Sequence, residues 1–581
     1  MALEKAKETI YIADWWLSPE IFLRRPPYFN QEWRLDQVLK RRAEAGVKIY
    51  IIVYKEVEAA VSCNSAHTKH ALHALCPKGT PGAGNITVMR HPDHNVFENA
   101  GDMTFYWAHH EKFIVIDYEL AFIGGLDLCF GRWDNKQHPL ADVHPAGVRN
   151  EMFPGQDFNN NRIMDFQKVE DWTSNALSKA DFGRMPWHDV AMGVIGDCVY
   201  DIAEHFVLRW NFVKRDKYKR DEEYDWLTME GREGDHEDLV AVQRPKFPVG
   251  KYIHHPLAPL ANRSWAHQQP GTVHAQVVRS SADWSSGILV EHSIQNAYCE
   301  VIRNAQHFVY IENQFFITAT GDEQAPVHNV IGRAIVDACV RAGKENRKFR
   351  VIIIIPSIPG FAGDLRDDAA MGTRAIMDYQ YKSICRGDNS IYGQIRKEGV
   401  DPTKHVFCFN LRSFDRLNKT PAMVQQEEKS GVKYQDVQRA QADEIMGGHN
   451  PRSTDEKPGG ENAGNEEAEH LADQKRKFEA SREEAGLGNM QSTNDDTISS
   501  TAMLNGGKVS QLRWDGDLET EKENFVQEEL YIHGKLCIVD DRIVICGSSN
   551  INDRVCPVTI PLPSILTPES HKWVSTTVNS Q

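Results

Sequence analysis

Two short segments of the sequence, 423 residues apart, share a histidine, a lysine and an aspartate at identical spacing. The matched pairs are His110 and His533, Lys112 and Lys535, and Asp117 and Asp540. The match extends at the same offset to a small turn after each segment, with Gly124, Gly125 and Asp127 in the first copy and Gly547, Ser548 and Asn550 in the second. A lone His-x-Lys is a weak signal, but five equivalent positions in register indicate an internal repeat.

The local pattern around each copy predicts how these side chains are held. Side chains alternate across a β-strand, so the histidine and lysine of one copy lie on the same face. The apolar run after each lysine predicts a buried strand, and a return strand then leads to the small turn, where glycine backbone allows close approach to a phosphate. If the two copies face each other, one site holds two imidazoles and two ammonium groups.

This set of groups suits exchange at a phosphodiester. One histidine attacks phosphorus to form a covalent phosphohistidine, and the other protonates the departing alcohol and later activates water or a second alcohol. The lysines neutralise charge on the non-bridging oxygens, an effect of ~10²–10³ in rate per donor. No metal is needed. Asp117 and Asp540 belong to the candidate catalytic set, although we favour a role for both in capping turns over direct proton transfer.

The elements that must position these groups predict an α/β fold. A helix is predicted over 35–45, and buried strands over 48–53, 308–311 and 350–355. A chain of 581 residues exceeds one ordinary core. We therefore expect two lobes, each a mixed, mostly buried β-sheet flanked by helices, related by pseudo-twofold symmetry around one shared active site.

Composition divides the chain into segments. Residues 1–212 form the first predicted lobe, and a charged, proline-containing linker follows over 213–272. Residues 273–554 form the second lobe, interrupted over 417–511 by text rich in Gly, Asn, Ser and Glu, which we expect to be a disordered insertion. Within it, 435–446 and 469–484 have the pattern of short solvated helices. Residues 555–581 form a tail of different character.

Charge, cysteine usage and hydropathy exclude several classes of protein. The net charge of −16 argues against general affinity for nucleic acid. The eleven cysteines are scattered and never spaced Cys-x-x-Cys, which favours free thiols in a cytoplasmic compartment. The first residues lack the apolar segment of a secretory signal, and no apolar run approaches the ~20 residues that span a bilayer.

Beyond the repeat, the chain resembles eukaryotic, particularly fungal, phospholipase D, a branch of the superfamily defined by the His-Lys-Asp motif. The matching segments are 14–20, 107–110, 131–134, 184–189, 310–316, 359–364 and 547–554. The resemblance implies hydrolysis of phosphatidylcholine to phosphatidic acid and choline, and transphosphatidylation with primary alcohols. It also implies peripheral association with a phospholipid membrane, no cofactor beyond stimulation by phosphoinositides, and small GTPases as partners. By resemblance, His110 is the nucleophile and His533 the acid and base.

Two departures from the family pattern carry further expectations. The family usually has lipid-binding modules and more catalytic core before the point matching Met1, so the first lobe reads as truncated. After Arg554 the family continues into an Asp-Ser-Glu segment whose acid orients a catalytic histidine. For His110, Asp134 or Asp127 is the candidate orienting acid. For His533 we find none in 555–581, since Glu569 has an unrelated context and Asp553 belongs to the turn motif, so we expect weak activity.

Three weaker signals have structural alternatives. His67, His70, His73, His91 and His94 complete no familiar metal-ligand spacing and read as ordinary surface or core histidines. Aromatic rings can hold choline through cation–π contact or simply pack in the core; the candidates are Trp15, Trp16, Trp133 and Trp187. A basic run can meet phosphoinositide headgroups or form a solvated helix end; it comprises Arg333, Arg341, Lys344, Arg347, Lys348 and Arg350.

Two other functions remain open from the residues alone. One is a nuclease or another phosphodiesterase with the same duplicated motif, against which the acidic balance and the lipid-branch segments weigh. The other is a truncated, catalytically weak lipid-binding protein, which the altered tail makes plausible.

Overall fold

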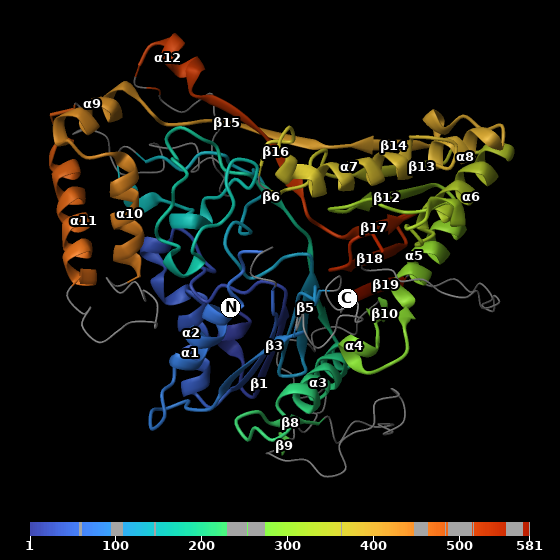
Figure 1. The fold of residues 1–581 in the computed structure, drawn as a ribbon, viewed down its shortest axis with the longest axis horizontal. Coiled ribbons are helices and arrows are strands. Elements are labelled where there is room, and N and C mark those ends of the chain that lie inside the picture. The colour runs from blue at the N-terminus through green and yellow to red at the C-terminus, as the bar shows by residue number, and fades with distance from the viewer. Residues whose placement is uncertain are drawn as a thin grey trace.

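The computed structural model describes residues 1–56, 61–93, 108–144, 147–228, 252–253, 273–361, 363–446, 463–482, 484–485, 514, 516–553 and 573–579. Two large sheets stand side by side, one built from the first part of the chain and one from the later part (Figure 1). Helices cover both sheets, and a smaller three-stranded sheet joins them. The predicted α/β class, with mixed sheets flanked by helices, is confirmed.

The first sheet has the order β3-β2-β1-β4-β5-β7. Its strands are β1 (Thr9–Asp14), β2 (Lys48–Tyr54), β3 (Ile86–His91), β4 (Phe113–Ile116), β5 (Leu120–Gly124) and β7 (Ala191–Ile195). Every residue of β1 is buried, because α1 (Leu35–Glu44) and α2 (Ser65–Ala74) cover one face and α3 (Cys198–Lys217) covers the other. Ile10 and Ile12 pack with Leu39 of α1, whereas Tyr11 stacks on Phe206 of α3.

The second sheet has the order β11-β10-β19-β18-β17-β12-β13-β14. Its strands are β10 (His274–Ser281), β11 (Glu291–His292), β12 (Phe308–Glu312), β13 (Arg350–Ile354), β14 (Val406–Phe409), β17 (Leu536–Val539), β18 (Ile543–Gly547) and β19 (Trp573–Asn579). One face packs against α5 (Ser293–Asn304), α6 (Ile331–Lys344) and α8 (Ile391–Lys397). Helices α4 (Asp283–Ser286) and α7 (Met371–Ile384) lie at its margins.

The two sheets place the repeated motifs on equivalent hairpins. In the first, β2 is parallel to β1, β1 is antiparallel to β4, and β4 turns back into β5. In the second, β13 is parallel to β12, β12 is antiparallel to β17, and β17 turns back into β18. The His-x-Lys triplets immediately precede β4 and β17. The pseudo-twofold relation of the two lobes stays a prediction.

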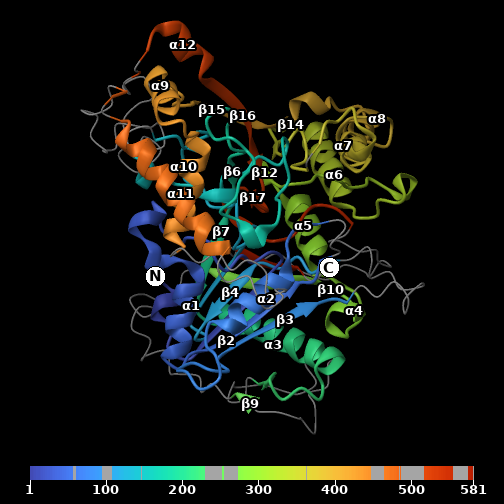
Figure 2. The same cartoon turned by 60° about the vertical axis from the view of Figure 1, so that its left-hand side comes forward.

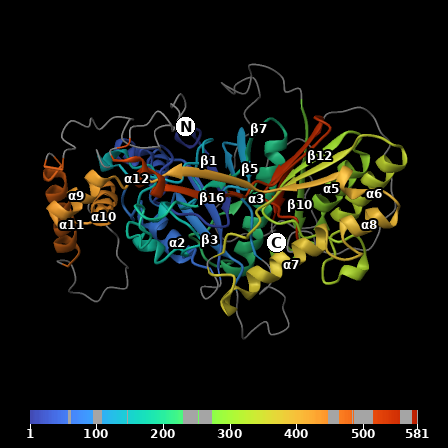
Figure 3. The same cartoon turned by 90° about the horizontal axis from the view of Figure 1, so that it is seen from above.

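A three-stranded sheet connects the lobes and has the order β15-β16-β6. Strand β16 (Phe525–Ile532) pairs antiparallel with β15 (Leu411–Arg416) and parallel with the two-residue β6 (Trp187–His188) of the first lobe. Seen from above, β16 crosses the middle of the molecule (Figure 3). Because β16 leads into His533, this pairing sets a first-lobe segment beside the second motif.

The structure contradicts the predicted disorder of 417–511 at three helices, which are α9 (Pro421–Ser430), α10 (Tyr434–Ile445) and α11 (Ala463–Ala480). Helices α10 and α11 overlap the segments 435–446 and 469–484, whose pattern predicts helices. The three helices gather beside the first lobe (Figure 2). Met423, Tyr434, Val437 and Phe478 form one buried cluster with first-lobe residues that include Val143. The few apolar residues of these helices are enough to hold them in place, because they pack against apolar residues of the first lobe. Residues 447–462, 483, 486–513 and 515 lie outside the described residues.

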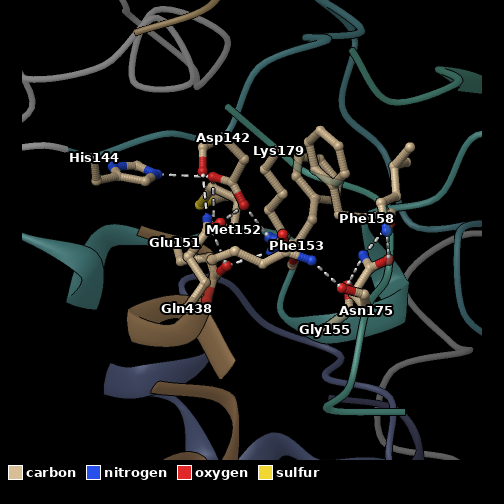
Figure 4. Close-up of polar contacts among 12 residues, drawn as sticks. Asp142, His144, Glu151, Met152, Phe153, Gly155, Phe158, Asn175, Lys179 and Gln438 are labelled. Atoms are coloured by element: carbon tan, nitrogen blue, oxygen red, sulfur yellow. Dashed lines mark hydrogen bonds and ion pairs between the residues drawn. The ribbon is translucent and has the colours of Figure 1, made fainter. Parts of the chain in front are cut away.

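Buried polar contacts also fix α10 to the first lobe (Figure 4). Gln438 Nε2 donates to the Asp142 carbonyl at 3.3 Å and to Glu151 Oε1 at 3.2 Å. The Lys179 ammonium donates to Glu151 and, at 2.5 Å, to the Phe153 carbonyl. Burial raises the pKa of Glu151 to about 7, although Lys179 opposes the shift. The helices therefore belong to the folded core of this region.

The remaining segment boundaries differ in detail from expectation. Helix α3 runs through the predicted boundary at 212 to Lys217, and within the predicted linker β8 (Trp226–Leu227) pairs with β9 (Tyr252–Ile253). Helix α12 (Leu518–Glu523) precedes β16. In the predicted tail, β19 pairs with both β10 and β18, inside the second sheet. Residues 229–251, 254–272, 554–572 and 580–581 lie outside the described residues. Among the described helices, none combines the length and apolar character needed to cross a bilayer.

Candidate active site

His110 and His533 line one cavity of about 270 Å³ between the lobes. Both lobes contribute to its wall: Trp15, Trp16, Asp127, Arg132, Asn161, Phe166 and Trp187 come from the first, and Gln314, Phe315, Gly360, Phe361, Tyr531 and Asn550 from the second. The two copies of the motif therefore converge, as their spacing and strand pattern predict. Each lobe alone would supply only one imidazole and one ammonium group.

The His110 ring is oriented by the other lobe. Its Nδ1–H donates to the backbone carbonyl of Ser548 at 3.2 Å, and its ring lies 5.9 Å from that of Trp15. A proton fixed on Nδ1 leaves the lone pair of Nε2 available, which is the state a nucleophilic imidazole requires.

The His533 ring is oriented by a carboxylate of the first lobe. Asp189 Oδ2 accepts a hydrogen bond from His533 Nδ1 at 2.6 Å, and both side chains are 4% exposed. The expectation that His533 lacks an acid is therefore wrong, and so is the reason for expecting weak activity. Asp189 lies in a segment that carries the family resemblance, but its role depends on the β6–β16 pairing, which joins residues far apart in the sequence.

The acids expected to orient His110 have other partners. Asp134 Oδ2 accepts from Arg184 Nη1 at 2.9 Å and from the Trp187 backbone N–H at 2.8 Å. Asp127 Oδ1 lies 3.1 Å from Lys112 Nζ. Both predictions are wrong: the first carboxylate holds a loop together, and the second balances a catalytic-site cation.

The two lysines make equivalent contacts with the histidines of their own motifs. Lys112 Nζ donates to the His110 carbonyl at 3.4 Å, and the Lys535 ammonium donates to the His533 carbonyl. Both are buried. Burial lowers the pKa of Lys535 to about 7, an effect that Asp189 opposes and Lys112 reinforces. A buried pair of ammonium groups favours a ligand that carries negative charge.

The same forces act on the imidazoles. Burial, then the neighbouring Lys112 and Lys535, lower the pKa of His110 well below its ordinary value. Burial and Lys535 do the same to the pKa of His533. Burial also raises the pKa of Asp189. These shifts favour neutral rings, and a phosphodiester bound beside them would supply the negative charge that allows one ring to hold a proton.

The small turns serve contact between the lobes as well as space for substrate. A Cβ atom on Gly125 would lie 2.4 Å from Asp189 Oδ1 and 2.8 Å from the His533 carbonyl oxygen, so only glycine fits. A Cβ on Gly124 would meet the Val190 carbonyl oxygen at 2.3 Å. The matching Gly547 donates its N–H to the Lys535 carbonyl at 3.2 Å.

Two buried polar groups of the second turn lack a protein partner within the described residues, and one of them, on Asn550, belongs to the cavity wall. Within the described residues, Ser548 Oγ and Asn550 Oδ1 are buried and have no hydrogen-bond partner. Asn550 lines the cavity. A buried polar group without a partner is costly. The Asn550 carbonyl oxygen would be satisfied by a donor such as a bound water or a substrate hydroxyl, and the Ser548 hydroxyl by a water or an acceptor that reaches it.

The structure does not bring Asp117 and Asp540 into the site. Asp117 accepts three backbone N–H groups at 2.8–2.9 Å, from Lys7, Glu8 and Thr9. Asp540 accepts the equivalent three at 2.7–2.8 Å, from Gln306, His307 and Phe308. Both stand at the far end of the motif strand with positive φ angles of 52° and 53°. Their place in the candidate catalytic set is therefore wrong, and the contacts support the favoured interpretation that both aspartates cap turns.

Among the candidate aromatic residues, Trp15, Trp16 and Trp187 line the cavity. Trp133 does not, because it packs against Phe153 in a separate cluster.

Two further residues of the site were not predicted from the sequence. One is Arg132, whose guanidinium lies 3.9 Å from the Trp187 ring centre and whose Nε lies 3.8 Å from Asp127. The other is Gln314, whose Oε1 lies 3.4 Å from Lys535 Nζ. Both belong to segments quoted for the resemblance, which was the available signal.

Three of the other candidate histidines have protein partners. His67 lies 2.7 Å from Glu20, His73 accepts the Val88 N–H at 3.1 Å, and His91 contacts Arg209. His94 lies outside the described residues. In the part of the chain that the structure describes, no three His, Cys, Asp or Glu side chains gather as metal ligands would.

The basic run lies at the end of the second sheet away from the cavity. Arg350 pairs with Phe308 at the start of β12, whereas Gln314 beyond the end of β12 lines the cavity. Within the run, Arg333, Lys344 and Arg347 form ion pairs with Asp337, Glu398 and Glu345, and Arg341 donates to the Ala305 carbonyl. Lys344, Lys348 and Arg350 are exposed.

Comparisons with known proteins show which family the sequence matches. A family profile described as Phospholipase D matches residues 2–450. Phospholipase D1 of Saccharomyces cerevisiae is 38% identical over 427 residues, which cover 73% of this chain and 23% of the yeast protein. Phospholipase D1 of Schizosaccharomyces pombe is 36% identical over 73% of this chain and 28% of its own length, and human Phospholipase D1 is 32% identical over 72% and 48%. The chain thus spans less than half the length of these relatives. It belongs to the phospholipase D family.

Proposed function

We propose that the chain hydrolyses phosphatidylcholine to phosphatidic acid and choline, and transfers the phosphatidyl group to primary alcohols, through a covalent phosphohistidine. The observation that carries the proposal is the pair of contacts across the lobes, His533 to Asp189 and His110 to Ser548, around one cavity. The names of the relatives supply the substrate class.

In the first step, His110 Nε2 attacks phosphorus and the bond from phosphorus to the choline oxygen breaks. His533 gives its proton to that oxygen, so choline leaves with a neutral hydroxyl group and keeps its quaternary ammonium charge. The different partners of the rings support these roles. Asp189 stabilises an imidazolium at His533, whereas the Ser548 carbonyl only fixes the tautomer of His110.

In the second step, His533 acts as the base. It accepts a proton from water or from a primary alcohol, whose oxygen attacks phosphorus as the bond to His110 Nε2 breaks. Phosphatidic acid forms with water, and a phosphatidyl alcohol forms with an alcohol. The enzyme returns to its starting protonation state.

The buried cations stabilise the charge that develops on the phosphoryl oxygens. Lys112 and Lys535 come from opposite lobes and provide one ammonium group each. Asn550 can rotate its amide to present the NH₂ group, and Ser548 offers its hydroxyl. Such preorganised donors contribute ~10²–10³ in rate each when they face the developing charge.

Aromatic rings beside His533 suit the choline group. The rings of Trp187 and Tyr531 have centres 4.7 Å and 6.3 Å from that of His533, the proposed proton donor to choline. A quaternary ammonium is attracted to aromatic faces. Arg132 already lies over Trp187, so the Tyr531 side is the better place for the cation.

Regulation by phosphoinositides and a small GTPase is proposed from family resemblance alone. The exposed members of the basic run, which are Arg333, Lys344, Lys348 and Arg350, are the side chains to test for anionic headgroups. Their distance from the cavity implies that any stimulation would act through membrane affinity or through the sheet.

The test is product analysis on vesicles. Purified protein is incubated with labelled phosphatidylcholine vesicles with and without ethanol, and His110→Ala and His533→Ala serve as controls. The proposal requires phosphatidic acid in both samples, phosphatidylethanol only with ethanol, and neither product from the variants. Cleavage of a nucleic acid but not of the lipid would instead support the nuclease alternative, and vesicle binding without product would support a lipid-binding protein.

A further inference from the structure

Strand β16 carries one continuous row of side chains from the cavity to the surface. Successive residues of a strand point to opposite faces, so Phe525, Gln527, Glu529 and Tyr531 share a face, and His533 continues the row beyond the end of the strand. Tyr531 and His533 line the cavity. The outer end of the same row therefore lies on the cavity side of the strand.

The outer end of this row is apolar and exposed. Phe525 is 47% exposed, and its diagonal neighbour Phe414 on β15 is 69% exposed. The register puts Phe414 opposite Gln527 and the exposed Arg412 opposite Glu529, so all of them lie on this face. The opposite face of β15 is covered at Ser413, which donates to the His138 carbonyl, and at Asp415, which accepts the N–H groups of Leu140 and Ala141.

The row continues into the loops that surround the cavity mouth. Glu529 accepts from Ser357, and a Cβ on Gly360 would lie 2.9 Å from the Tyr531 ring, so residues 357–361 lie along this face. At the end of that loop Phe361 is 46% exposed while lining the cavity. Asn161 Nδ2 donates to the Gly360 carbonyl at 3.3 Å, which brings the loop of Ile163, 45% exposed, to the same mouth.

We propose that this apolar face, formed by Phe525, Phe414, Phe361 and Ile163, is the surface by which the protein rests on a phospholipid bilayer. The inference rests on the proposed function, because a lipid with two acyl chains reaches the cavity at lowest cost if the mouth opens onto the membrane. Large exposed apolar side chains that extend from the rim of a cavity along the adjoining strands mark an interaction surface. Phenyl rings gain free energy when they enter the interface of a bilayer, and Arg412 adds attraction to anionic lipid.

The test separates membrane binding from chemistry. Phe414→Ser/Phe525→Ser changes two side chains outside the cavity. Vesicle cosedimentation is measured with phosphatidylcholine containing phosphatidic acid, and turnover is measured both on these vesicles and on a short-chain phosphatidylcholine below its critical micelle concentration. We expect vesicle affinity and vesicle turnover to fall about tenfold or more, with turnover of the monomeric lipid unchanged.

Matched variants complete the design. Leu289→Ser/Val290→Ser removes two exposed apolar side chains that follow α4, a helix well below β15 and β16 in Figure 1, and should bind vesicles like the parent. Phe414→Leu/Phe525→Leu keeps apolar character and should retain most binding, and Ile163→Ser provides a second site if the serine pair does not fold. Unchanged vesicle affinity in both Phe414→Ser/Phe525→Ser and Ile163→Ser would overturn the inference. Absence of turnover on either lipid by the parent would instead count against the proposed function.

Discussion

Asp189 of the first lobe and His533 of the second meet at 2.6 Å, and this contact completes the site across the boundary between the lobes. The pairing of β6 with β16 makes it possible, because the His188 carbonyl accepts the N–H groups of both His533 and Gly534. Gly125 leaves room for the carboxylate. The site is therefore formed only when both lobes are folded and docked.

Replacing Asp189 by Asn should remove the orienting carboxylate while keeping its size. The amide NH₂ would favour the wrong tautomer of His533, and we expect kcat to fall by about 10³–10⁴ with little change in KM. Steady-state kinetics with a pH profile checks this, with Asp189→Glu as the conservative control. Retention of more than about a tenth of the parent kcat would show that another group orients His533.

Replacing Asp540 by Ala should affect stability rather than chemistry. The carboxylate accepts three backbone N–H groups at the start of β12, so its loss should lower the free energy of unfolding by about 3 kcal/mol. Activity measured well below the melting temperature should stay near that of the parent. The neighbouring Asp541→Asn, at an exposed position, is the control. A large loss of kcat without loss of stability would restore a catalytic role for Asp540.

The repeat made the reactive core of this site predictable, since His110, Lys112, His533 and Lys535 were identifiable from one constant offset. The orienting groups were not, because Ser548 and Asp189 reach their histidines through tertiary contacts that no local pattern encodes. Asp134, chosen for nearness in sequence to the glycine turn, is held by Arg184 instead. Proximity along the chain predicts elements, but contacts between elements depend on their pairing.

The segment over 417–511 also shows that tertiary contacts cannot be predicted from local sequence. Its composition is polar, and the apolar residues of α10 are too few to predict a buried face when only the segment itself is considered. The structure buries Tyr434 and Val437 against Val143, which lies almost 300 residues earlier. A prediction from composition uses only the apolar content of the segment itself and carries no information about the surface of another segment against which it packs.

Replacing Phe478 by Ala tests whether these helices are part of the folded core. Phe478 is buried against Tyr434, with ring centres 5.9 Å apart, and we expect a loss of about 3–5 kcal/mol in unfolding free energy. The adjacent Lys477→Ala, at an exposed position, should change stability by less than about 0.5 kcal/mol. Chemical denaturation measures both. Equal stability of the two variants would favour the disordered insertion.

Replacing Glu151 by Gln should change how stability depends on pH. Burial raises the pKa of Glu151 from 4.5 to about 7, so between these values the folded protein holds a proton that the unfolded chain has released. Stability from this group is therefore present below pH 4.5 and is lost as pH rises towards 7. Because glutamine does not titrate, the variant should show a flatter curve across that window. Parallel melting curves for parent and variant from pH 4.5 to 7 would contradict the shift.

The proposed mechanism depends above all on which histidine carries the phosphatidyl group during turnover. Asp189→Asn is mixed with phosphatidylcholine, quenched at alkaline pH to preserve phosphohistidine, digested and mapped by mass spectrometry; His110→Ala and His533→Ala serve as controls. His533 serves both steps, so the Asp189 exchange slows formation and breakdown of the intermediate, and quenching during turnover captures the fraction of enzyme that carries it; the mechanism requires a phosphatidyl group on His110 and none on His533. A phosphatidyl group on His533, or continued turnover with neither histidine modified, would contradict it.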